Sequence, residues 1–407
     1  MKHIKTIFTL TGLLVIATLS WGQTAQRYHI DNTVRINRTY CSSLSKLSVL
    51  IPCPMSNQYQ TIKNVRIDEG GELLSCPDSD NKYVRFLNYS DQLQALGDKP
   101  EFTVSFDATL RPVHFDFSQV DTIYPYNTSS PEYQQFTGAS NVYIVPDNPT
   151  IKSIANQIWS QSADYLDYAR QCYEYVANNY EYLNPYTGLH PLSQLLADGG
   201  GDCGNLSSIY ISLLRNKKIP SRHVVSILPD NDYHIWAEFY LEGYGWIPVD
   251  VTYKNSDPFG DYFGNYDGFA IVVSTGIILT LEKLPDVTYQ CVLFQSYEYW
   301  YWHNNANLCS NITAKHIVHS QLQTEVDETQ DQRLAVYPNP TTGIVKIKGG
   351  EFKEVKVYNT LGVMVGYLKT KGQDDTEVDL SNLPNGIYVL QASDENQHLT
   401  RQVVKMK

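Results

Sequence analysis

Three polar side chains, Cys203, His234 and Asp250, are of the types needed for catalysis by an activated thiol. Cys203 follows three glycines and Asp202, a residue type that caps helix N-termini, so we expect it in the first turn of a helix. There the helix dipole favours the thiolate, the nucleophilic form of cysteine. His234 could accept the thiol proton and later return a proton to the leaving amine, while Asp250 orients the ring.

Two predicted strands must bring these groups together, because the three residues are far apart in the sequence. Alternation places His234 and Trp236 on one face of the first strand, and Trp246 and Asp250 on one face of the second. A Gly-containing turn at 242–245 would join the strands as a hairpin and could set Asp250 beside His234. Trp236 and Trp246 could line a substrate groove, although packing in the core explains them as well.

Two amphipathic helices are predicted upstream of this hairpin. Residues 164–180 place apolar side chains three or four positions apart, which forms one apolar face. A second helix begins at Cys203 and shows the same spacing until it must end before Pro220. The helix that carries the thiol therefore has a defined start and a face for packing.

Three sequence blocks in this region resemble the transglutaminase-like superfamily of papain-type cysteine enzymes. The blocks are GDCGNLSSIYISLLRNKKIPSRHVV, DYHIWAEFYL and GWIPVDVTY, within residues 148–252. The resemblance implies that Cys203 is the nucleophile, His234 the general base and Asp250 the residue that orients it. Many relatives carry a bulkier or acidic residue after the cysteine, where this chain has Gly204, so the details of the substrate do not carry over.

The resemblance implies amide chemistry through an acyl-enzyme thioester and leaves its outcome open. Joining glutamine to lysine, deamidating glutamine, and hydrolysing peptide or glycan amides are all compatible with it. A cysteine peptidase on the same triad and a non-catalytic surface binding protein are the competing functions. The oxyanion hole should use the Cys203 backbone N–H and one further donor, for which Tyr182 and Asn184 are candidates.

The chain ends are predicted to direct export. Lys2 and Lys5 precede an apolar run at 7–19, and small residues allow cleavage before Gln23, which is typical of a signal peptide at 1–22. A single spanning helix is the alternative, but the run is shorter than the roughly 20 residues that a bilayer requires. The mature protein is therefore expected to be secreted or at the cell surface.

The remaining pattern predicts an α+β protein with several domains. Alternating runs and turn clusters predict a β-rich N-terminal domain at 23–147, with the pattern of a small sandwich. A papain-like transglutaminase core with a β-rich extension follows at 148–320. A polar linker is predicted at 321–332, and short strands at 333–407 predict a small C-terminal β-sandwich.

The C-terminal segment carries a second resemblance. The blocks LAVYPNPTTGIVKIKG, EVKVYNTLGVMV, VDLSNLPNGIYVLQ and QVVKMK resemble the C-terminal sorting domain of the type IX secretion system of Bacteroidetes. This implies the type IX secretion machinery as a partner, and release or attachment to cell-surface lipopolysaccharide after the tail is removed. An accessory β-sandwich that binds carbohydrate is the alternative.

Charge and composition exclude some partners, while the resemblance to the transglutaminase-like superfamily implies a protein or peptide substrate. The 407 residues carry 43 acidic and 31 basic side chains, a net charge of -12, and no basic run. A binder of nucleic acid or of an anionic membrane needs the opposite sign at its contact surface. We therefore expect no nucleic-acid partner.

No cofactor or metal is predicted from the sequence. Asp257, Asp261, Asn265 and Asp267 lie in a Gly-rich loop and could supply oxygen ligands to calcium. Their spacing is not that of an EF-hand, so a solvated loop over the cleft is the favoured interpretation. No histidine has cysteine or carboxylate partners at zinc-site spacing.

Seven cysteines in an exported chain predict disulfides and one reactive thiol. If Cys203 is the nucleophile, six remain, and Cys172 is expected to be a buried free thiol on a helix. Fewer than three disulfides are therefore predicted, namely Cys291 with Cys309 and one pair among Cys41, Cys53 and Cys76.

Overall fold

The structure is a computed structural model, and the residues it describes form two compact units, one within 1–323 and the other within 324–407. It describes residues 25–183, 188–257, 259–323, 335–339, 341–348, 352–359, 364–370, 376–393 and 398–405. The predicted signal peptide lies outside the described residues, as do Asn184 and the predicted linker from residue 324 onward. Within the described ranges, no helix is long and apolar enough to cross a membrane.

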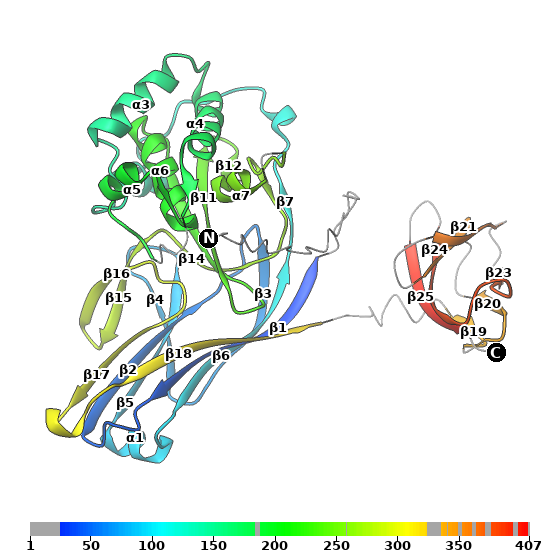
Figure 1. Ribbon diagram of the computed structural model, residues 1–407, viewed down its shortest axis with the longest axis horizontal. Helices are drawn as coiled ribbons and strands as arrows, with labels where there is room; N and C mark the ends of the chain where they lie inside the picture. The colour runs from blue at the N-terminus through cyan, green and yellow to red at the C-terminus, as the bar shows by residue number, and fades with distance from the viewer. Residues whose placement is uncertain are drawn as a thin grey trace, which may run out of the picture. The chain divides into compact units, whose positions relative to one another are not determined.

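Two four-stranded antiparallel sheets form a β-sandwich in the first unit (Figure 1). One sheet has the order β18-β1-β6-β3, with bounds Thr313–Leu322, Gln26–Asn37, Glu101–Leu110 and Gln60–Ile67. The other has the order β17-β2-β5-β4, with bounds Glu298–His303, Leu44–Cys53, Lys82–Tyr89 and Gly71–Ser75. Strict alternation in β6 buries every second residue, including Phe102, Val104 and Phe106, in the core.

Strands from both ends of the first unit build this sandwich. β18 pairs with β1 over ten residue pairs, from Tyr28 opposite Leu322 to Asn37 opposite Thr313. β17 pairs in the same way with β2. The chain thus leaves the sandwich, forms the predicted core, and returns to complete both sheets. The last two strands of the β-rich extension that we assigned to the core, β17 and β18, are therefore part of the N-terminal sandwich.

The return of the chain to the sandwich also determines which two cysteines form a disulfide bond. Cys41 follows β1, and Cys309, 268 positions later in the sequence, precedes β18. The pairing of these two strands brings the two cysteines together, and they form a disulfide bond. The predicted bond between Cys291 and Cys309 is wrong: Cys291 is a buried free thiol on β16 (Val287–Val292), whose partner is β15 (Ile278–Leu284). The pair expected among the first three cysteines is also wrong. Cys172 is buried and free, as expected, and fewer than three disulfides form.

A helical layer and one four-stranded sheet form the rest of the first unit (Figure 1). The sheet has the order β12-β11-β10-β14, with bounds Gly245–Val249, Tyr233–Leu241, Ser221–Ile227 and Ile271–Thr275. The helices are α3 (Pro149–Trp159), α4 (Tyr165–Asn179), α5 (Leu192–Asp198), α6 (Cys203–Asn216) and α7 (Val251–Ser256). Both predicted helices are confirmed, as α4 and α6, and the hairpin as β11 and β12.

The two faces of this sheet have different partners. Ala237 and Phe239 on β11 share a hydrophobic core with the helices. On the opposite face, Trp236 packs with Tyr59 and Tyr266. Helix α6 is buried along nearly its whole length between its neighbouring helices and the sheet. The helix that carries the thiol is therefore fixed by packing along nearly its whole length.

Short elements connect these layers. They are α1 (Ser90–Leu96), α2 (Pro131–Phe136), the pair β7 (Val113–His114) and β13 (Asn265–Tyr266), and the parallel pair β8 (Glu181–Tyr182) and β9 (Gly200–Gly201).

The second unit consists of two small sheets that share one core. Their orders are β19-β20-β23 and β22-β21-β24-β25. The strands are β19 (Ala335–Tyr337), β20 (Ile344–Lys348), β21 (Glu354–Asn359), β22 (Met364–Lys369), β23 (Thr376–Asp379), β24 (Gly386–Ser393) and β25 (His398–Lys405). Val345 and Ile347 of one sheet pack with Val357 and Leu390 of the other. The chain has the predicted α+β class.

Candidate active site

Cys203 is the first residue of α6, as the sequence predicts. The Asp202 side chain caps the helix by accepting the backbone N–H of Asn205 at 3.0 Å. Among the free cysteines of the described residues, Cys203 is partly exposed while the other four are buried. It is therefore the free thiol that a substrate can reach.

The three glycines before Cys203 allow a tight passage of the chain. Gly199 ends α5 with a φ of +77°, a left-handed conformation that favours glycine. A Cβ on Gly200 would lie 2.0 Å from the carbonyl oxygen of Glu181, and one on Gly201 would lie 2.5 Å from the Cβ of Asn205. Glycine is needed here so that β9 can pass between β8 and the start of α6.

Asn205 ties the start of α6 to the preceding loop. Its buried side-chain amide donates to the Asp202 carboxylate at 2.8 Å and to the carbonyl of Gly188 at 3.0 Å. Its side-chain oxygen accepts the backbone N–H of His190 at 2.9 Å. Sequence reasoning missed this function, because the first turn of a helix gives no signal of which loop lies beside it.

His234 lies near the start of β11 with its ring almost fully buried. Its Nε2 atom is 2.5 Å from the Asp250 carboxylate, and its ring lies close enough to the Cys203 thiol for the two to interact electrostatically. Since Asp250 occupies Nε2, Nδ1 is the ring nitrogen left for the thiol. Tyr253 stacks on the ring at a centroid distance of 4.8 Å and helps to fix its plane.

Opposing effects set the pKa of His234. Burial disfavours the charged ring, but the negative charge of Asp250 and its hydrogen bond outweigh burial and raise the pKa of His234 to about 10. The interaction with Cys203 acts in the same direction. The imidazolium form is thus favoured at neutral pH, and it can donate a proton to a leaving group.

Asp250 links β12 to α7 and is held by four contacts. One carboxylate oxygen faces His234, and the other accepts the backbone N–H groups of Thr252 at 3.0 Å and Tyr253 at 2.9 Å. Its own N–H donates to the carbonyl of Tyr262 at 3.0 Å. Asp250 is therefore both the N-cap of α7 and the partner of the imidazole, which fixes its position.

Tyr182 lies close enough to Cys203 for the two side chains to interact electrostatically. Burial raises the pKa of Tyr182, and the charges of Cys203 and Asp202 raise it further. The residue remains 42% exposed. Of the two candidate oxyanion donors, Tyr182 is near the thiol, and Asn184 lies outside the described residues.

The two candidate substrate-binding tryptophans lie in different surroundings. Trp236 is buried, and its indole N–H donates to the Tyr59 hydroxyl at 3.3 Å. Trp246 lines a separate cavity, with the guanidinium of Arg222 4.0 Å above its ring. Within the described residues, no hydrogen bond joins either indole to Cys203, so their part in binding substrate stays a prediction.

Three of the four candidate calcium ligands have protein partners. The Asp261 carboxylate pairs with Arg170 at 3.3 Å, and that of Asp257 accepts the Tyr262 hydroxyl at 3.0 Å. The Asn265 amide donates to the carbonyl of Asp261 at 2.9 Å. Within the described residues, no group of three or more His, Cys, Asp or Glu side chains could hold a metal ion.

Two family models and several known proteins match the chain. Residues 152–251 match the transglutaminase-like superfamily, and residues 335–406 match the secretion system C-terminal sorting domain. An uncharacterized protein of Haemophilus influenzae is 21% identical over 243 residues, which cover 51% of this chain and 64% of the relative. Beta-agarase D of Zobellia galactanivorans is 28% identical over 103 residues, which cover 25% and 20%.

The chain thus spans less than two thirds of the length of either curated relative. Among solved structures, a candidate cysteine protease from Cytophaga hutchinsonii is similar with a TM-score of 0.49 and 16% identity, over 74% of this chain and 92% of that one. The chain carries a transglutaminase-like domain at residues 152–251 and a secretion sorting domain at residues 335–406.

Proposed function

We propose that this protein is an exported cysteine enzyme that attacks amide bonds of proteins or peptides. One observation carries the proposal: a buried imidazole, His234, lies between a partly exposed thiol, Cys203, with which it interacts, and a carboxylate, Asp250, to which it is hydrogen-bonded. A nucleophile, its base and the group that orients the base are the requirements of acyl transfer.

In the first half-reaction, His234 holds the proton of Cys203 and the thiolate attacks the amide carbonyl carbon. The backbone N–H of Cys203 donates to the developing oxyanion, and Tyr182 is our choice for the second donor. The imidazolium then gives its proton to the departing nitrogen, the C–N bond breaks, and ammonia or an amine leaves. A thioester on Cys203 remains, and Asp250 stays ionised throughout.

The second half-reaction decides the product. If water attacks the thioester, His234 accepts a proton from the water and returns it to the sulfur, and the result is deamidation or peptide hydrolysis. If a primary amine attacks, the same proton transfers give a new amide bond. The contacts of the triad are equally suited to both outcomes, so the experiment must distinguish them.

Export is proposed from the C-terminal domain together with the sequence. The sorting domain at 335–406 indicates handling by a secretion system that delivers proteins to the cell surface or beyond. We propose that a signal peptide at 1–22 directs the first membrane crossing. Attachment of the processed protein to lipopolysaccharide is a further part of this proposal.

The test supplies a glutamine-rich protein and a fluorescent primary amine to the purified full chain. Incorporation of label indicates transfer, ammonia without label indicates deamidation, and new peptide termini indicate proteolysis. Cys203→Ala and His234→Gln should abolish whichever signal appears. His303→Gln, an exposed histidine outside the triad, is the matched control and should retain it.

The proposal fails if Cys203→Ala retains the activity of the parent protein in all three readouts. It also fails if alkylation of Cys203 is no faster in the folded protein than in the denatured chain. Those results would favour a binding protein that uses the same fold without catalysis.

A further inference from the structure

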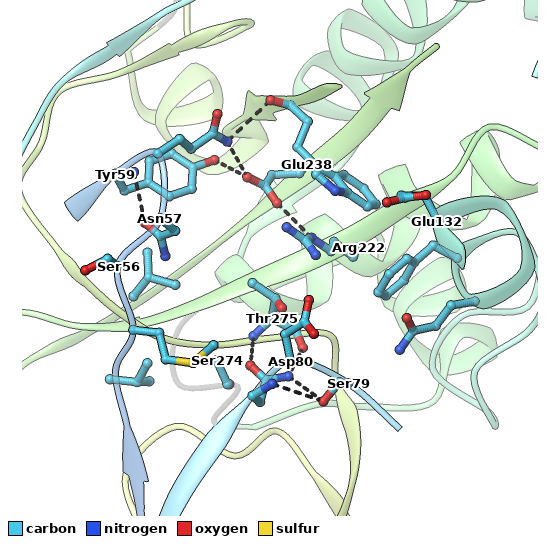
Figure 2. A pocket seen from close by; sticks show the side chains of 18 of the residues that line it. Ser56, Asn57, Tyr59, Ser79, Asp80, Glu132, Arg222, Glu238, Ser274 and Thr275 are labelled. Atoms are coloured by element: carbon cyan, nitrogen blue, oxygen red, sulfur yellow. Dashed lines mark hydrogen bonds and ion pairs between the residues drawn. The ribbon is translucent and has the colours of Figure 1, made fainter. Parts of the chain in front are cut away.

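A cavity of about 500 Å³ lies on the first unit (Figure 2), and Cys203 is not among the residues that line it. Its walls come from the loop between β2 and β3, the turn between β4 and β5, α2, and strands of the four-stranded sheet around β11. Along one face of β11 the order is His234, Trp236 and Glu238, so buried Trp236 separates the catalytic histidine from this cavity. Its volume is in the range of small-ligand sites.

A buried carboxylate forms the floor of the cavity. Glu238 is 1% exposed, and both of its oxygens are occupied. One accepts the Tyr59 hydroxyl at 2.5 Å and the Gln58 amide at 2.7 Å, and the other accepts the Nε–H of Arg222 at 2.9 Å. The charge of Glu238 is therefore satisfied within the protein, and it fixes Arg222 from one side.

Arg222 is held with part of its donor set unused. It lies opposite Glu238 in the β10–β11 register, and its guanidinium lies 4.0 Å from the Trp246 ring and 5.5 Å from the Phe136 ring. Only Nε donates to Glu238, and Nη1 and Nη2 have no hydrogen-bond partner in the described part of the chain. A stacked guanidinium with two free parallel donors is preorganised for a carboxylate.

Two further carboxylates line the same cavity. Figure 2 shows Asp80 and Glu132 on the walls around Arg222. Neither has a hydrogen bond or ion pair within the described ranges, and neither is buried. Because Arg222 and Glu238 neutralise each other, Asp80, Glu132 and Lys82 leave the lining with one net negative charge. A simple anion is therefore disfavoured, and a ligand that also carries a positive group is favoured.

We propose that this cavity binds a small zwitterion, a free amino acid or short peptide. The ligand carboxylate would accept hydrogen bonds from Nη1 and Nη2 of Arg222, and its ammonium group would face Asp80 and Glu132. The site is distinct from the catalytic triad and does not depend on its activity. Trp246, predicted from the sequence to line a substrate groove, acts here as the platform on which Arg222 stacks.

Calorimetric titration of the full chain carrying Cys203→Ala tests the proposal without turnover. The probes are leucine, glycyl-leucine, N-acetyl-glycyl-leucine and glycyl-leucine amide. We expect leucine or glycyl-leucine to bind. The probe that binds more tightly shows whether the site takes a free amino acid or a short peptide. Blocking either end of the dipeptide removes one charged contact and should weaken binding by about tenfold or more.

Pocket variants establish where the probe binds. Arg222→Lys keeps a positive charge beside Glu238 but removes the planar fork, and should weaken binding at least about tenfold. The double variant Asp80→Asn/Glu132→Gln should weaken the free dipeptide but leave the acetylated one unchanged. These two side chains are not buried, so this variant serves if Arg222→Lys does not fold. Glu69→Gln, an exposed carboxylate outside the cavity, is the control and should bind normally.

Three results would overturn the proposal. These are no binding of any probe at millimolar concentration, equal binding of blocked and free dipeptides, and binding that the pocket variants leave unchanged.

Discussion

Asp250→Asn separates the charge of Asp250 from its structural position. Asparagine caps helices as well as aspartate does, so the bonds to the N–H groups of α7 can be retained. The negative charge that faces His234 at 2.5 Å is lost. Any change in the ionisation of His234 in this variant is then electrostatic in origin.

The size of the effect follows from the balance that sets the ionisation of His234. Asp250 overcomes burial to hold the pKa of His234 at about 10, and without it burial should push the pKa below the ordinary value of 6.5. Near pH 8 the parent ring is almost fully protonated, whereas the variant ring would be protonated in about 3% of molecules or fewer. Catalysis that needs the imidazolium should therefore fall about thirtyfold or more near pH 8, and the loss should shrink as the pH is lowered towards the pKa of the variant ring.

The contribution of the His234–Asp250 pair to folding stability should also decrease as the pH rises. Because the pKa of His234 is raised in the folded protein, its contribution to stability is complete below pH 6.5 and disappears as the pH rises through about 10. The difference in unfolding free energy between the parent and Asp250→Asn should thus be largest near pH 6 and shrink towards pH 10.

Histidine ring signals in nitrogen-correlated NMR measure this ionisation directly. The His234 signals are assigned by their disappearance in His234→Gln, and their midpoint is followed from pH 5 to pH 10.5. A parent midpoint near 6.5, or one that Asp250→Asn leaves in place, would refute the reasoning.

Three further variants test the architecture by chemical denaturation. Gly200→Ala should destabilise the protein by about 3 kcal/mol because its Cβ would meet the β8 backbone, whereas exposed Gly138→Ala, with open space around it, should change stability by less than about 0.5 kcal/mol. Glu238→Gln should cost about 3 kcal/mol, since it breaks a buried ion pair whose remaining partner is partly exposed. Replacing both Cys41 and Cys309 by serine should cost up to about 5 kcal/mol, because that bond closes a loop of 268 positions. These estimates would be contradicted if Gly200→Ala and Gly138→Ala were equally stable. They would also be contradicted if Glu238→Gln, or the variant without the disulfide, were as stable as the parent protein.

Local patterns were sufficient to predict the elements that carry the triad. Asp202 marks the start of α6, and Pro220 requires it to end. Alternation of period two places His234 on a face of β11, and the short turn brings β12 back beside that strand. These features could be predicted because each depends on neighbouring residues. Asp250 was expected on the second strand, but it follows the end of β12 as the N-cap of α7 and reaches His234 from there.

Features that depend on distant pairing could not be predicted. The pairing of β18 with β1 joins segments almost 300 residues apart, and nothing in either strand specifies its partner. The bond between Cys41 and Cys309 follows from that pairing, whereas the sequence analysis paired Cys309 with Cys291. The cavity around Arg222 needs the register of two strands and the approach of three loops, of which the sequence specifies none.

An acyl adduct on Cys203 tests the central claim most directly. The full chain is mixed with a protein substrate, quenched in acid during turnover, digested, and analysed by mass spectrometry. The account predicts a hydroxylamine-sensitive acyl group on Cys203, and its absence in His234→Gln. Amide turnover that proceeds without this adduct, and that persists in Cys203→Ala, would contradict the account.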